Sequence, residues 1–339
     1  MDSKRWDDLT SKNGMLGYLD MNLRGAGQVF FQNNPWTGLI ILAAIFWGAR
    51  AAGDLNVAFG AVVGLFVSTT TAILLNVDRA SLRQGLFGLN GVLVGVAVPI
   101  FLHPHPMMWA YLLLGAAVST VATLAVANVV KSWGIPGSTA PFVFTTWVLL
   151  LGAYSFTHLP IATMGPPALP AAAGAGGMTL SLHTVLSSLG KNISQVYLIE
   201  NFWTGVLFIV AIAINSIRSA GFAVIGSVIG LGAALVFGAG AGATASGLYG
   251  FSAVLTAMAV GLAFEKLSLR AVLYAVLATV FTVVVQAAFN TALSPLGIPP
   301  LTFPYVLTMW LFLLPGIDLM PHPKASPVVM IPFRSSKGY

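Results

Sequence analysis

Apolar segments long enough to cross a membrane follow one another along almost the whole chain. A transmembrane helix needs roughly 20 apolar residues to cross a hydrocarbon core about 30 Å thick. Of the 339 residues, 57% are hydrophobic and 7% are charged, whereas an ordinary soluble domain carries about a quarter charged residues. The sequence therefore predicts an all-α integral membrane protein with a single membrane domain.

The lengths of the apolar runs and the positions of Gly, Pro and charged residues predict ten spans in two sets of five. A stretch rich in Pro, Gly and Ala, from Leu159 to Gly177, separates the two sets. The first set covers residues 35–50, 55–76, 85–102, 107–130 and 138–157, and the second covers 201–216, 220–238, 247–263, 270–290 and 301–316.

Basic residues are distributed unequally between the two sides of this topology. With ten spans and a cytoplasmic N-terminus, all 15 Lys and Arg residues except Arg50 and Lys191 fall on the inner side. Cytoplasmic loops of membrane proteins are enriched in Lys and Arg. The pattern predicts that both termini are cytoplasmic, and it explains the net charge of +6 without a nucleic-acid partner.

Three segments occur twice in the same order, at separations of 167, 162 and 163 residues. Because each half contains an odd number of spans, the second copy must insert upside down, as in many transporters whose solute path lies between inverted repeats. We therefore predict a cytoplasmic N-terminus (1–23), a first inverted repeat (24–158), an extracellular or periplasmic connection (159–190), a second inverted repeat (191–316) and a cytoplasmic C-terminus (317–339). The duplicated segments are 24–38 with 191–205, 85–93 with 247–255, and 134–142 with 297–305.

A short apolar run precedes the first span of each half, Gly25 to Gln32 and Asn192 to Ile199. Each run is too short to cross, and a half-spanning pore helix would suit both, because irregular backbone at membrane depth must face protein or a water-filled path. The alternative is a helix that lies on the headgroups. The matched Gln28 and Gln195 favour the pore, since an amide offers a neutral polar solute both donors and an acceptor.

In the third duplicated pair, Thr139 and Thr302 each stand two residues before a proline, Pro141 and Pro304. This spacing breaks a helix and frees backbone carbonyls beside a hydroxyl group. The alternative is a Thr N-cap with proline in the first helical turn. The two interpretations are compatible, because a capping Thr at a broken helix can still face a solute path.

The second duplicated pair is rich in glycine and places apolar side chains at helical spacing. Leu89 and Leu93 share one helical face, as do Phe251 and Leu255. Close packing between helices through small residues is the alternative role for this pair. Asn90 is a polar residue inside a span, and we expect it to make a hydrogen bond between helices.

The residues needed for catalysis or metal binding do not gather in the predicted spans. The nine carboxylates fall in termini, connections or span ends, the five histidines fall outside the spans, and cysteine is absent. We expect Glu200, at the start of a span, to interact with a helix dipole rather than with substrate. The sequence thus favours a transporter without cofactor, metal or ion coupling over an intramembrane enzyme.

The three duplicated segments resemble the urea transporter family over nearly the whole chain. The signatures are Gln28-Val-Phe-Phe-Gln-Asn-Asn-Pro-Trp with its second copy, Gly85-Leu-Phe-Gly-Leu-Asn-Gly-Val-Leu with Gly247-Leu-Tyr-Gly-Phe-Ser-Ala-Val-Leu, and Thr139-Ala-Pro-Phe with Thr302-Phe-Pro-Tyr. The resemblance implies a homotrimer embedded in membrane lipid, with one passive urea pore per subunit. In such a pore, backbone carbonyls along one wall accept hydrogen bonds from urea, and flat apolar side chains enclose its two faces.

Carried over by motif, the resemblance implies eleven filter residues. Two stand at each mouth, Gln28 with Val29 and Gln195 with Val196, while Thr139 and Thr302 mark the centre. The apolar slot would comprise Phe31, Leu89, Leu93, Phe251 and Leu255.

This chain departs from the family pattern at three of these segment positions. The family usually has Phe at the position of Leu89, often an acidic residue at Gln195, and commonly Asn at Ser252. These departures bear on the choice between urea and close amides. The sequence predicts a urea channel of a cell membrane, in particular a bacterial inner membrane, with a channel for short amides or ammonia as the alternative.

Overall fold

The computed structural model describes residues 3–171 and 181–320. Part of the predicted connection and most of the predicted C-terminal segment, with Lys324, Arg334 and Lys337, lie outside the described residues. Within those ranges the chain is helical, without strands, and Leu102 and Ile161 form an isolated antiparallel bridge. The expectation of an all-α protein is confirmed.

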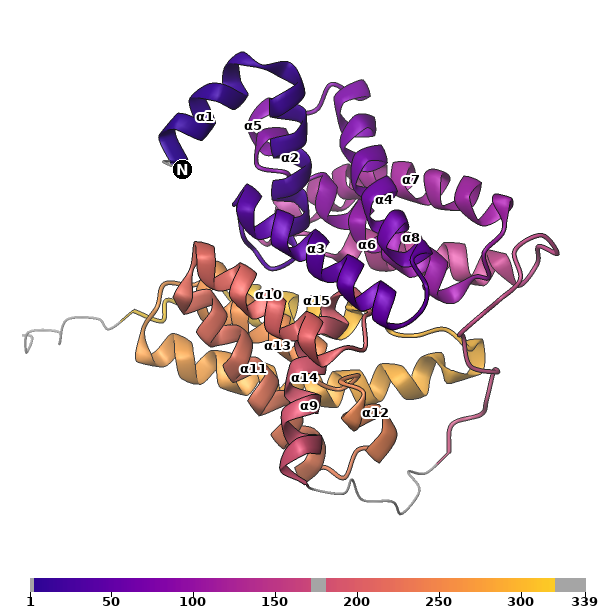
Figure 1. Ribbon diagram of the computed structural model, residues 1–339. Helices are drawn as coiled ribbons and strands as arrows, with labels where there is room; N and C mark the ends of the chain where they lie inside the picture. Colours follow the sequence, from indigo (N-terminus) through magenta and orange to yellow (C-terminus); the bar gives the residue numbers. More distant parts are fainter. Residues whose placement is uncertain (1–2, 172–180, 321–339) are drawn as a thin grey trace, which may run out of the picture.

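The first half of the chain forms the upper body in Figure 1, and the second half forms the lower body. The first half contains α1 (Ser3–Lys12), α2 (Gly14–Gln28), α3 (Pro35–Ala51), α4 (Asn56–Leu74), α5 (Arg79–Arg83), α6 (Gly88–Phe101), α7 (Pro106–Lys131) and α8 (Ala140–Ala153).

From α9 onward the second half presents an order of long and short helices similar to that of α2 to α8. It contains α9 (Leu182–Ser194), the 3-10 turn η1 (Gln195–Tyr197), α10 (Phe202–Asn215), α11 (Ile217–Val236), α12 (Ala241–Ala245), α13 (Phe251–Met258), the π-helical segment η2 (Ala259–Ala263), α14 (Leu269–Leu293), the 3-10 turn η3 (Ser294–Leu296) and α15 (Phe303–Leu313).

Each predicted span contains a helix, but many of these helices are shorter than expected. In the described residues, α4, α7, α11 and α14 are long and apolar enough to cross a membrane, and α9 with α10 would add a fifth span despite a bend of 71°. The other apolar helices, α3, α6, α8, α13 with η2, and α15, have 10–17 residues. Several of these helices are shortened by turns within the duplicated segments. Such turns are tolerated at membrane depth where protein surrounds the irregular backbone.

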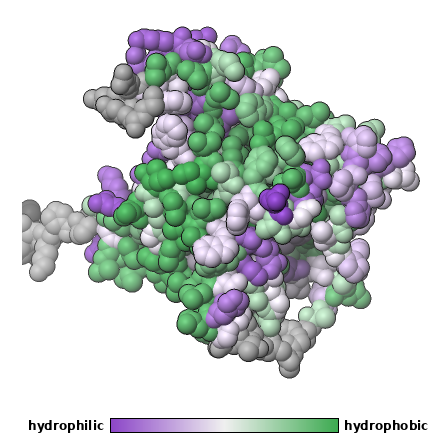
Figure 2. Space-filling view, in the orientation of Figure 1, coloured by the Kyte–Doolittle hydropathy of each residue, from purple (hydrophilic) through white to green (hydrophobic). Residues whose placement is uncertain are grey.

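Exposed apolar side chains surround the bundle. Trp47, Val148 and Leu273 are each more than half exposed, and Figure 2 shows hydrophobic residues over much of the visible face. A soluble monomer rarely exposes such a surface. Together with the long apolar helices, it identifies an integral membrane protein.

Glycines bring α4 and α6 into backbone contact. A Cβ atom on Gly60 would lie 2.2 Å from the carbonyl oxygen of Gly95, and one on Gly95 would lie 2.1 Å from the carbonyl oxygen of Gly60. Small residues allow membrane helices this close approach. Within the duplicated segment itself, a Cβ atom on Gly91 would lie 2.5 Å from the carbonyl oxygen of Gly64 on α4, so the alternative role of that segment, close helix packing, is present in the first half.

Candidate functional site

Four non-glycine residues with positive φ mark the turns at the predicted filter. They are Phe31 (φ 61°) after α2, Leu198 (φ 56°) after η1, Ser138 (φ 47°) before α8 and Leu301 (φ 53°) before α15. Such backbone is uncommon outside glycine and persists only where surrounding structure holds it, often at ligand sites. Phe31 and Leu198 occupy equivalent places in the first duplicated pair, and Ser138 and Leu301 do so in the third.

The two predicted half-spanning helices are longer than expected and begin earlier. In place of helices over Gly25–Gln32 and Asn192–Ile199, the structure has α2 from Gly14 and α9 from Leu182, each ending before the positive-φ turn. Their C-terminal turns are buried, including Ala26 in α2 and Ile193 in α9. These ends therefore pack inside the protein, which disfavours a helix lying wholly on the headgroups.

Gln28 and Gln195 make equivalent hydrogen bonds at the ends of these helices. Nε2 of Gln28 donates to the backbone carbonyl of Gln84 at 2.8 Å, and Nε2 of Gln195 donates to that of Ser246 at 3.0 Å. Each bond joins the C-terminal end of α2 or α9 to the turn that leads into α6 or α13. The amide orientation is thus fixed by a main-chain acceptor in both halves.

Thr139 and Thr302 meet across the interface between the halves. Their hydroxyl oxygens are 2.8 Å apart, and the two residues are 1% and 2% exposed. Both occupy N-cap positions with proline in the first turn, yet neither makes a side-chain cap bond to its helix. The capping position and the helix break therefore coexist, while each hydroxyl is directed to the other half.

Two tryptophans repeat this reciprocal arrangement. Nε1 of Trp147 donates to the carbonyl of Pro299 at 2.9 Å, and Nε1 of Trp310 donates to that of Pro136 at 2.8 Å. Each tryptophan lies 163 residues from its counterpart, as does each proline. Equivalent residues of the two halves thus make equivalent contacts with the opposite half.

A second reciprocal pair joins α3 to α10. The hydroxyl of Thr37 donates to the carbonyl of Ala211 at 2.8 Å, and that of Thr204 donates to Ala44 at 3.3 Å. Donors and acceptors are each separated by 167 residues, the same separation as in the first duplicated segment.

The predicted apolar slot residues belong to one buried cluster that spans both halves. Val29, Leu93, Val196 and Leu255 are at most 1% exposed, and Phe31 packs against this cluster. Leu89 and Phe251, at 9% and 7% exposed, are also members. The structure therefore gathers the predicted apolar residues into a single core region at the interface.

Asn90 ties the filter region to neighbouring helices. Its Nδ2 donates to Thr123 Oγ1 on α7 at 3.1 Å and to the carbonyl of Ser138 at 3.3 Å, while its Oδ1 accepts from the backbone N–H of Phe142 at 3.0 Å. The predicted interhelical hydrogen bond of Asn90 is confirmed. The additional bonds hold the strained turn that presents Thr139.

Leu198 and Tyr305 are interface residues that the sequence-based site omits. Leu198 has the same backbone conformation as Phe31 at the equivalent position, so the 167-residue separation was the signal that identifies it. Tyr305 is fully buried, and its hydroxyl lies 2.7 Å from Ser138 Oγ. The first half has Phe142 at the position equivalent to Tyr305, so no shared motif marks this hydroxyl.

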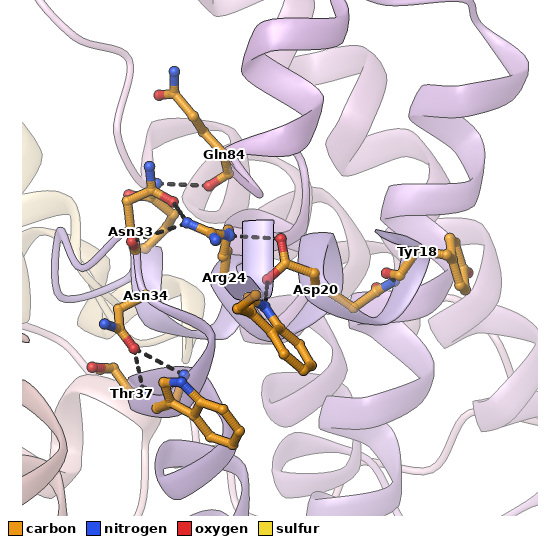
Figure 3. Close-up of polar contacts among 11 residues, drawn as sticks. Tyr18, Asp20, Arg24, Asn33, Asn34, Thr37 and Gln84 are labelled. Atoms are coloured by element: carbon orange, nitrogen blue, oxygen red, sulfur yellow. Dashed lines mark hydrogen bonds and ion pairs between the residues drawn. The ribbon is translucent and has the colours of Figure 1, made fainter. Parts of the chain in front are cut away.

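Charged side chains form ion pairs beside α2 and α9. Arg24 Nε lies 2.7 Å from Asp20, and Arg24 Nη1 donates to Asn33 at 3.0 Å (Figure 3). At the equivalent place in the second half, Lys191 pairs with Glu200 at 2.8 Å. Glu200, expected to interact with a helix dipole, therefore has a lysine partner in the structure.

Two carboxyl groups in connections have shifted pKa values. Hydrogen bonds from Ser81, at the start of α5, lower the pKa of Asp78. Burial, with a smaller contribution from Asp318, raises the pKa of Glu265. Among the described residues, no group of three or more His, Cys, Asp or Glu side chains is placed to hold a metal ion.

Two surface cavities lie away from the predicted filter. One, of about 670 Å³, is lined by residues that include Phe237, Tyr249 and Asn290. The other, of about 420 Å³, is lined by residues that include Met107 and His158. Neither cavity is lined by a predicted filter residue. The candidate site is therefore defined by the contacts between the two halves.

Comparison with known proteins identifies similar sequences over most of the chain. A family model described as urea transporter matches residues 19–317. Urea transporter 1 of Ovis aries and that of Capra hircus are each 31% identical over 326 residues. Urea transporter 1 of Rattus norvegicus is 31% identical over 332 residues, and each alignment covers 94% of this chain and 83% of the relative.

Proposed function

The chain belongs to the urea transporter family, and we propose that it lets urea cross a membrane passively, through a path between its two halves. Family membership makes it a transporter rather than an enzyme. The observation that carries the path is the buried contact between Thr139 and Thr302, at 2.8 Å, where two broken helices meet.

The chemistry of urea fits this arrangement. Urea is planar and neutral, with four N–H donors and one acceptor oxygen, so a selective path needs acceptors in register and a narrow apolar gap. Helix C-termini carry carbonyls without intrahelical partners, and α2 and α9 both end at the proposed filter. In this proposal those carbonyls, Gln28, Gln195 and the two threonines supply acceptors, and the valine, leucine and phenylalanine residues enclose the faces of urea.

Ions are excluded from such a path by desolvation. Asp20 is the only charged side chain among the described buried residues, and an ion that enters a low-dielectric site without partners loses far more hydration energy than a neutral solute. Urea keeps most of its hydrogen bonds by exchanging water for protein acceptors.

The architecture proposed for this path is two inverted repeats, each with five transmembrane helices and one half-spanning helix, over residues 24–158 and 191–316. Support comes from the similar order of α2–α8 and α9–α15 and from the equivalent bonds that Trp147 and Trp310, and likewise Thr37 and Thr204, donate to backbone carbonyls of the opposite half. Reciprocal contacts are what a pseudo-two-fold axis in the membrane plane would generate.

The proposed assembly is a homotrimer with both termini on the cytoplasmic side of a cell membrane. The unequal distribution of Lys and Arg supports this orientation. A bacterial inner membrane stays a prediction, because the relatives described above are mammalian proteins.

Urea flux into liposomes tests the proposed function. Vesicles that contain the purified protein should equilibrate with urea faster than protein-free vesicles in a stopped-flow light-scattering experiment. A rate equal to that of protein-free vesicles, from correctly folded protein, would contradict the proposal.

A further inference from the structure

The helix that carries Phe251 and Leu255 ends in a π-helical segment, Ala259–Ala263. The backbone N–H of Phe264 donates to the carbonyl of Ala259 at 3.0 Å, five residues earlier in the chain. Single π turns inside helices are rare and are found frequently at functional sites. The wider turn changes the direction in which the following residue, Phe264, leaves the helix.

Tight packing on α11 holds the π segment in place. A Cβ atom on Gly261 would lie 2.3 Å from the ring of Phe222, which is itself 8% exposed. Only a residue without a side chain allows the ring of Phe222 to lie this close to the segment. The orientation of Phe264 therefore depends on a packed surface rather than on a free loop.

Phe264 directs its ring to a proposed filter residue. The ring centroids of Phe264 and Phe31 are 5.6 Å apart at an interplanar angle of 84°, an edge-to-face contact. On another side, Phe31 contacts Tyr305, which is fully buried at the interface, with centroids 6.3 Å apart. Phe264 is 40% exposed, so it lies between Phe31 and the surface of the protein.

The equivalent position in the first half is built differently. Leu102 lies 162 residues before Phe264, and it is fully buried and bridged to Ile161. The helix that precedes it, α6, continues to Phe101 and has no π segment among its described residues. The position equivalent to Phe264 therefore carries a buried leucine in place of an exposed aromatic ring.

We propose that Phe264 lines the path at its cytoplasmic mouth and, with Phe31, sets the size of solute admitted there. The side follows from Lys266, in the connection after Phe264, and from Arg270, in the first turn of α14, which the charge distribution places inside. This inference rests on the proposed function and deepens it. A phenyl ring offers a planar solute an apolar surface and no hydrogen-bond donor. Phe264 therefore discriminates between solutes by their width and not by their hydrogen-bonding groups.

Two substitutions of opposite effect test the role of Phe264. Phe264→Ala should raise the ratio of methylurea flux to urea flux several-fold, because the mouth becomes wider. Phe264→Trp should lower that ratio, because a larger ring narrows the mouth. The matched control is Phe281→Ala, which removes a ring with a similar exposed fraction, 37%, that contacts Phe312 on α15 rather than Phe31.

The flux ratio in liposomes separates the possible results. Suppose that the wild type conducts urea and that at least one of the two variants elutes as folded protein. If the flux ratio in that variant is unchanged, the proposed role of Phe264 is wrong, while the proposed function stands. A shift of the same size in Phe281→Ala also overturns it, because the effect would then not depend on the mouth. Absence of urea flux in the wild type instead contradicts the proposed function and is seen before any variant is compared.

Discussion

At the scale of single residues, four polar side chains of the proposed filter are held by specific partners rather than left for water. Thr139 and Thr302 bond to each other, and Gln28 and Gln195 each bond to a backbone carbonyl. In a low-dielectric interior a buried hydroxyl without a partner is costly. Substitutions at these positions should therefore lower both folding stability and urea flux. Comparing the two losses separates a structural role of a residue from a role in transport.

Thr139→Val keeps the shape of the side chain and removes one hydroxyl of the central pair. Leaving the Thr302 hydroxyl unpaired should lower the free energy of unfolding by about 1–3 kcal/mol. Urea flux should fall more than the yield of assembled protein. The control is Thr291→Val, because the exposed hydroxyl of Thr291 bonds only to a carbonyl one turn earlier in α14. An equal loss of flux and assembly in Thr139→Val would indicate that Thr139 has a purely structural role.

Gln28→Ala removes an amide at one proposed mouth. Loss of one hydrogen bond in the path corresponds to about 0.5–1.5 kcal/mol, or roughly a 2- to 10-fold slower urea flux. Gln84→Ala is a matched control, because Gln28 contacts the backbone carbonyl of Gln84 and not its side chain, which Figure 3 shows directed away from that contact. If the two variants slow flux equally, Gln28 does not contribute through its amide.

The sequence predicts these polar residues because a duplicated Gln or Thr in apolar surroundings is conspicuous. It predicts Phe31 as well, but it omits Leu198, which only the 167-residue separation identifies, and Tyr305, which no shared motif marks. Leu198 differs in residue type from Phe31, and what they share is a backbone conformation. Positive φ at a non-glycine residue follows from tertiary packing, which no local pattern encodes.

At the scale of helices, the ten predicted spans overlap ten helices or helix segments in the described chain, but the predicted ends are wrong in several places. The pore helices begin at polar N-caps, Asn13 for α2 and Ser181 for α9, whose side chains accept backbone N–H groups. Those residues lie in polar stretches that a hydropathy pattern assigns to connections. α8 and α15 each begin two residues later than predicted, after the positive-φ turns at Ser138 and Leu301, and they end four and three residues earlier than predicted.

Close packing of α4 and α6 predicts a large difference between two glycine substitutions. Gly95→Ala would place a Cβ atom 2.1 Å from the carbonyl oxygen of Gly60, so the helices must separate and thermal stability in detergent should fall sharply. Gly232→Ala, where nothing lies within 4 Å of the added Cβ, should be neutral or stabilising, by up to about 1 kcal/mol, because Ala has the higher helix propensity. Similar melting temperatures for the two variants would contradict the packing described here.

At the scale of the whole molecule, the two halves are joined by bonds that come in equivalent pairs. The duplicated sequence identifies Trp147 and Trp310 as counterparts, but not their acceptors, because the backbone carbonyls of Pro299 and Pro136 carry no residue signature. Sequence duplication thus predicts which residues are equivalent. The distances between the halves depend on how they pack, and only the structure supplies them.

Equivalent contacts should have equivalent energies. Trp147→Phe and Trp310→Phe each remove one indole N–H bond to the opposite half, and each should lower the free energy of unfolding by about 0.5–1.5 kcal/mol. Thermal unfolding in one detergent measures both, with Trp133→Phe as the control at an exposed residue. A large loss in one variant and none in the other would contradict the reciprocal arrangement.

The contact between Thr139 and Thr302 has a consequence for the direction in which its protons point. Either oxygen can be the donor, and each hydroxyl has a single hydrogen, so only one of the two can donate to the other at a time. The remaining hydrogen is then free to turn towards whatever occupies the centre. Two arrangements, related by exchange of the donor, are thus available, and a rotation of two hydroxyl groups converts one into the other. In the proposed inverted arrangement, a urea molecule that arrives from either compartment meets the same hydrogen-bonding pattern, so the proposed centre does not distinguish entry from exit.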